Sequence, residues 1–153
     1  MARLEDIPEA TRTNIVALDC PTPASRPFVT GPPLKDRSIA LLSTAALCKR
    51  GDAPFLPGTA EMRELPAALP ASEIVMSHVS INFDRQGWQR DINTIYPIDR
   101  LRALAAAGVI GGVADTHFTV MGSTDPKLME EAADSIVARM QRDRIGAILA
   151  CPV

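Results

Sequence analysis

The sequence is poor in aromatic residues, histidine and paired cysteine. Phe, Trp and Tyr make up 4% of its 153 residues, and it has two histidines. Its three cysteines, Cys20, Cys48 and Cys151, lie far apart and form no CxxC pair. This usage argues against a disulfide framework and favours reduced thiols, so we expect a cytoplasmic protein.

The chain also lacks the features of a nucleic-acid-binding or membrane protein. The formal net charge is -2 and no stretch is strongly basic, so we expect no nucleic-acid partner. No apolar run reaches the roughly 18 residues that a membrane span requires. The N-terminus, MARLEDIPEATR, has mixed charge and no apolar signal segment.

The remaining composition, 46% hydrophobic and 22% charged, is ordinary for a globular protein. Residues 1–36 contain DCPTPASRPFVTGPPLKD, with five prolines that restrict the backbone. We therefore expect an extended N-terminal arm over 1–36, lying on a neighbouring surface, and a single domain over 37–153. A disordered tail is the alternative for the arm.

Hydrophobic patterns predict alternating strands and helices over 37–153. The expected elements, in order, are strand 38–43, a long loop over 49–72, strand 73–80, helix 97–107, extended segments 109–113 and 117–121, a helix from Asp125-Pro126 to about 142, and strand 145–150. This order predicts an α/β fold: a mostly parallel sheet with flanking helices in three layers, similar to flavodoxins or racemases.

Ligands of parallel sheets bind at the carboxyl ends of the strands. We therefore expect one site built from the polar residues that follow the strands: Ser43, Thr44, Cys48, His78, Ser80, Asn82, Asp84, His117, Thr119, Gly122, Ser123, Thr124 and Cys151.

Within this set, His78 and His117 are candidates for acid–base work or for activating a thiol, and Cys151 is the candidate thiolate. Gly122 and Ser123 lead to a helix start that can hold a carboxylate. Structural burial is the alternative for each histidine and for Cys151, and simple capping by Asp125 is the alternative for the helix start. Cys20 and Cys48 are expected to be inert.

Two further interpretations remain open. His78, Asp84 and His117 could hold a metal ion, but their spacing is not that of a compact metal motif, and we predict no metal site. The charged residues around Gly87-Trp88 form either a lid or partner surface or a solvated loop packed on the tryptophan.

Two long segments resemble a known family. IALLSTAALCKRGDAPF, followed by SHVSINFDRQGWQRDINTIYPIDRLRALAAAGVIGGVADTHFTVMGS, is similar to the selenoprotein B-type subunits of glycine, sarcosine and betaine reductases and of D-proline reductase. The resemblance covers about residues 37–153. It rests on SHxSxNFD, YPIDRLRxLxxxGxIG and HFxxMGS occurring in this order.

The resemblance implies a redox-active selenocysteine or cysteine after a strand like AILACPV, hence directly after Val153. Because UGA encodes selenocysteine and is otherwise read as stop, we expect a chain truncated at that codon. The gene sequence past codon 153 tests this expectation. A UAA or UAG stop there, or no family sequence downstream, would contradict it.

The resemblance also implies the reaction, reductive cleavage of a C–N bond α to a carboxylate in a small amino-acid-like substrate. A pyruvoyl group on a partner subunit would bind the amine, and a dithiol or thioredoxin-like donor would supply electrons. On this interpretation Cys151, His78 and His117 are catalytic, and Ser43, Thr44, Ser80, Asn82, Asp84, Gly122 and Ser123 bind substrate. We expect a homo-oligomer or a complex with a partner reductase subunit.

Two alternatives stay open. A cysteine-dependent racemase or lyase needs a second thiol, for which Cys48 is the candidate, so replacing Cys48 should abolish racemisation but not reduction. A non-catalytic binding or assembly subunit would have an ordinary buried Cys151 thiol, and its open sheet edge would need a partner.

Overall fold

Strand β1 (Ser38–Ser43) is the centre of the main sheet. The computed structural model describes residues 3–17, 22, 24, 30–80 and 85–153. Strand β7 (Ala147–Cys151) runs parallel to β1 along one edge. The short strands β5 (Gly112–Val113) and β6 (Thr116–Val120) run parallel to β1 along its other edge. Strand β3 (Met62–Pro66) pairs antiparallel with β6.

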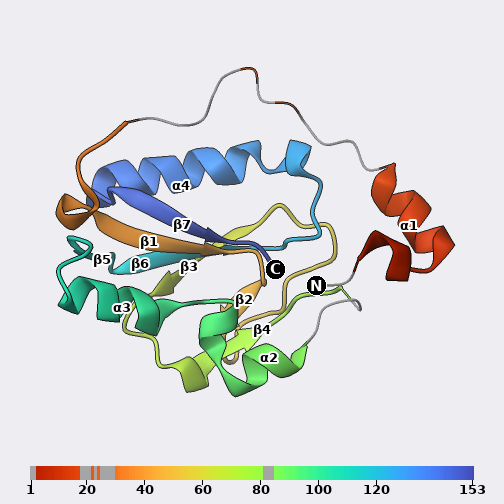
Figure 1. Cartoon of the computed structure of the whole chain (residues 1–153), viewed down its shortest axis with the longest axis horizontal. Coiled ribbons are helices and arrows are strands. Elements are labelled where there is room, and N and C mark those ends of the chain that lie inside the picture. Colours follow the sequence, from red (N-terminus) through yellow and green to blue (C-terminus); the bar gives the residue numbers. More distant parts are fainter. Residues whose placement is uncertain (1–2, 18–21, 23, 25–29, 81–84) are drawn as a thin grey trace.

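Helices cover both faces of this sheet (Figure 1). Alternate residues of β1 point to opposite faces, and most are buried because both faces are covered. Helix α4 (Glu130–Asp143) packs on one face through Ile136, beside Ala40 and Phe118. Helices α2 (Arg85–Arg90) and α3 (Ile98–Ala106) cover the other face, where Leu41 and Leu101 meet. The expected three-layer α/β fold with a mostly parallel sheet is confirmed.

Strands β2 (Leu47–Lys49) and β4 (Ile74–Met76) form a separate antiparallel pair. The chain leaves β1 through Ala46, which is fully buried and has a left-handed φ of 51°. The expected strand over 73–80 is therefore shorter and lies outside the parallel sheet. Its hydrophobic pattern was read correctly, but its pairing partner depends on this turn and not on local sequence.

The expected loop over 49–72 is wrong in part because it contains β3. This strand reads MRELP, with two charges and a proline, and its burial alternates only weakly. Such a composition is typical of a strand at the edge of a sheet and resembles a loop in sequence.

The helix expected to begin at Asp125-Pro126 begins later. Asp125 caps a 3₁₀ turn, Pro126–Leu128, where its carboxylate accepts a 2.9 Å hydrogen bond from the Lys127 amide. Helix α4 starts only at Glu130. The cap was identified correctly, but the first turn is tighter than an α-helix.

The N-terminal 36 residues include a helix that was not expected, α1 (Glu9–Val16), none of whose residues is buried. Three-residue 3₁₀ turns, at Leu4–Asp6, Leu34–Asp36, Ala71–Glu73 and Ile92–Thr94, complete the described elements. Half of the proline-rich stretch, including Cys20, lies outside the described residues. Over the described ranges, no helix is long and apolar enough to span a membrane.

Candidate functional site

Three chain segments meet at the carboxyl end of β1. The Thr44 amide donates to the Cys151 carbonyl at 3.2 Å, and the Val153 amide donates to Thr44 Oγ1 at 2.9 Å. From the other side, the Gly122 amide donates to the Thr44 carbonyl at 2.9 Å. Thr44 thus joins the end of β7 to the turn after β6, as expected for the ends of neighbouring parallel strands.

Gly122 is required by this close approach. A Cβ atom at residue 122 would lie 2.8 Å from the Thr44 carbonyl oxygen and 2.9 Å from Thr44 Cβ. Both contacts are shorter than van der Waals separation, so only glycine fits without displacement. The glycine of the HFxxMGS segment, its penultimate residue, therefore has a packing reason.

Ser43 lies at this end of β1 but is fully buried. Its hydroxyl donates to the Ile95 carbonyl at 2.8 Å and accepts from the Ala45 amide at 3.3 Å. Thr119, on β6, similarly accepts a 2.7 Å hydrogen bond from the Leu47 amide. Both hydroxyls stabilise the turns that follow the strands, and neither is exposed to a ligand.

The Cys151 thiol is half-buried in the apolar layer beneath the sheet, with Val153 beside it. Burial raises its pKa, so the neutral thiol is favoured. Burial also raises the pKa of Cys48, which lies in a separate cluster with Phe55 and Met121. The two thiols thus belong to different clusters, which gives no support to a two-cysteine racemase.

His117, the second residue of β6, is fully buried. The Leu41 amide donates to its Nδ1 atom at 2.9 Å, so in the neutral ring the proton is on Nε2. Burial, aided by the charge of Arg102, lowers the pKa of His117 to about 4. Leu41 lies between the part of β1 that pairs with β5 and the part that pairs with β6. At this point the imidazole accepts the hydrogen bond that a backbone carbonyl would otherwise accept from the Leu41 amide. This arrangement favours a structural role for His117 over proton transfer.

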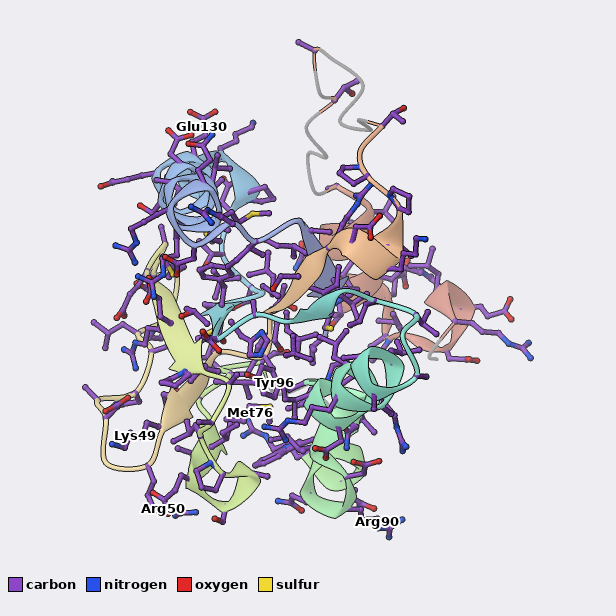
Figure 2. All side chains as sticks on the ribbon, turned by 90° about the vertical axis from the view of Figure 1, so that its left-hand side faces the viewer. Lys49, Arg50, Met76, Arg90, Tyr96 and Glu130 are labelled. Atoms are coloured by element: carbon purple, nitrogen blue, oxygen red, sulfur yellow. The ribbon has the colours of Figure 1, made fainter. Side chains whose placement is uncertain are left out.

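Tyr96 is the residue that the sequence analysis missed. Its ring packs edge-on against His117, with centroids 5.5 Å apart at 84°. Figure 2 shows Tyr96 in the interior, between the sheet and the helices below it, while Arg90 and Glu130 lie at the periphery. Burial raises the pKa of Tyr96 above its ordinary value. The only signal was a lone tyrosine in the apolar context INTIYPI.

Three polar side-chain atoms in the layer between the main sheet and helices α2 and α3 are buried and have no hydrogen-bond partner in the described part of the chain. They are His117 Nε2, Tyr96 Oη and Trp88 Nε1. Trp88 lies on α2 and packs on the same cluster, so the loop interpretation of Gly87-Trp88 is replaced by a short packed helix. A buried polar atom without a hydrogen-bond partner costs free energy, so each of these three atoms lowers the stability of this layer.

His78 follows β4 and is buried. Its Nδ1 accepts from the Ser80 amide at 3.1 Å, and its carbonyl accepts from Arg85 at 2.9 Å. Burial and the nearby Arg85 charge lower the pKa of His78. The adjacent Ser77 amide donates to the Ala46 carbonyl, which ties this segment to the turn after β1. Asn82 and Asp84 lie outside the described residues.

The expected anion site at Gly122 and Ser123 gains no support from its surroundings. The amides of Gly122 and Thr124 donate to the Thr44 and Met121 carbonyls, so they are not free to bind an anion.

A separate cavity of about 350 Å³ lies between the start of β3 and α4. It is lined by Ala60, Glu61, Met62, Glu131, Ala132 and Ser135. Its two carboxylates oppose an anionic ligand. No group of three or more metal-ligating side chains occurs within the described ranges.

Comparison with known proteins gives one informative similarity. The chain is 29% identical over 119 residues to D-proline reductase subunit gamma of Acetoanaerobium sticklandii. This match covers 76% of the chain and 48% of the relative, so the chain spans about half of that protein's length. It supports a distant relationship to that family. No family model matches, and no solved structure is similar.

Proposed function

We propose that this chain is a subunit of a reductase related to D-proline reductase. The similarity over 119 residues to subunit gamma carries the proposal. The chain spans about half of that relative's length. The substrate and the partner subunits of this chain are therefore proposed together with its reaction. The selenoprotein B-type assignment, suggested by the order of the sequence motifs, is the finer form of the same proposal.

The proposed reaction is a two-electron reductive cleavage of a C–N bond α to a carboxylate. The C–N bond breaks, and the carbon and nitrogen each gain a proton. A dithiol supplies the two electrons and becomes a disulfide. A selenocysteine or cysteine after Val153 would supply the nucleophile, and a pyruvoyl group on a partner subunit would hold the amine.

The chain's own contribution would be to position that nucleophile. Val153 is held by Thr44 Oγ1, and its side chain joins the apolar layer that includes Cys151. A residue directly after Val153 would therefore lie at the carboxyl end of β1, close to Thr44. Cys151, with its raised pKa, would support this position, while a catalytic role for it remains a prediction.

The test is the dithiol-dependent consumption of D-proline by the complex purified through an affinity tag on this chain. Mass spectrometry follows the loss of substrate, with glycine, sarcosine and betaine as alternative substrates. Consumption that requires dithiol supports the proposal. No consumption of any of the four, by a complex that is folded and intact, overturns it.

A matched pair of variants tests the positioning role. Thr44→Val removes the acceptor of the Val153 amide and should lower kcat with little change in KM, while Thr44→Ser should restore activity. Cys48→Ser should leave activity unchanged, since Cys48 lies in a different cluster. Equal loss in Thr44→Val and Thr44→Ser would contradict positioning by the hydroxyl.

A further inference from the structure

We draw no further inference here: the strongest candidate, the cluster of buried polar atoms His117 Nε2, Tyr96 Oη and Trp88 Nε1 between the main sheet and helices α2 and α3, carries nothing, because it belongs to the layer already described and nothing in the described part of the chain shows what would bind to it.

Discussion

Thr44 connects more backbone than any other residue at the carboxyl end of β1. Its amide, carbonyl and hydroxyl bind Cys151, Gly122 and Val153. The local sequence STAAL does not distinguish a threonine whose hydroxyl binds a ligand from one whose hydroxyl stabilises the fold. The structure assigns its Oγ1 to the Val153 amide, a contact across 109 residues that no local pattern reveals.

Replacing Thr44 should therefore affect stability as well as activity. Thr44→Val removes the only protein acceptor seen for the Val153 amide in the described chain and should lower the free energy of unfolding by about 1 kcal/mol. Chemical denaturation measures the change. Thr44→Ser keeps the acceptor and should lose less. If both variants lose the same amount, the methyl group and not the hydroxyl is responsible.

Gly122 offers a second residue-scale prediction. Gly122→Ala places a methyl group 2.8 Å from the Thr44 carbonyl oxygen and should cost about 1–3 kcal/mol of stability. Gly87→Ala is the control, because no atom lies within 4 Å of its added Cβ. This control, in helix α2, should raise stability by about 0.5–1 kcal/mol. Thermal unfolding of both variants distinguishes crowding from a general effect of losing glycine.

Among the elements, helix α4 depends on Arg139 for its attachment to the sheet. This side chain forms ion pairs with Asp143 at 2.8 Å and with Glu64 at 3.5 Å, and it donates to Thr116 Oγ1 at 2.9 Å. It therefore joins α4 to both β3 and β6. An arginine near the end of a helix is common in sequences, and nothing local distinguishes this one from Arg142.

Comparing these two arginines tests the attachment. Arg139→Met keeps the apolar stem but loses the polar contacts and should lower the free energy of unfolding by about 1 kcal/mol. Arg142→Met is the control, because Arg142 is 62% exposed and pairs only with the adjacent Asp143 among the described residues. Urea denaturation should give a clear loss for the first variant and little for the second.

Elements with strong internal patterns could be predicted from the sequence. The apolar run of β1 and the amphipathic faces of α3 and α4 gave correct types, and the bounds of β1 and α3 were nearly correct, while α4 begins later than expected, at Glu130. Strand β3 could not be predicted, because an edge strand needs no apolar alternation. The assignment of β4 to a second sheet, and the edge packing of Tyr96 on His117, depend on distant partners and not on local sequence.

At the scale of the whole molecule, His117 links stability to pH. Its pKa is about 4 in the folded state and about 6.5 in an unfolded chain. Between these values the unfolded chain binds a proton that the folded one excludes, so stability falls as pH decreases from about 6.5 to 4. The total loss from this group is about 3 kcal/mol at most, because below pH 4 both states are protonated.

Denaturation at a series of pH values measures this dependence. His117→Gln should be less stable than the natural chain at pH 7 but should lose less stability on acidification. The lowered pKa of His78 contributes in the same direction, so part of the slope should remain. An unchanged slope in His117→Gln would mean that the buried imidazole is not the group that titrates.

The position of β1 also has a consequence for folding kinetics. Its partners lie far along the chain, since Leu41 contacts His117 across 76 residues and Thr44 contacts Val153 across 109. Closing loops of this length costs entropy before the contacts form. Folding dominated by such distant pairs is slow, typically on the scale of milliseconds to seconds. During synthesis, the central strand cannot acquire its β7 neighbour until residue 151 has left the ribosome, so its apolar edge on that side stays unpaired until then.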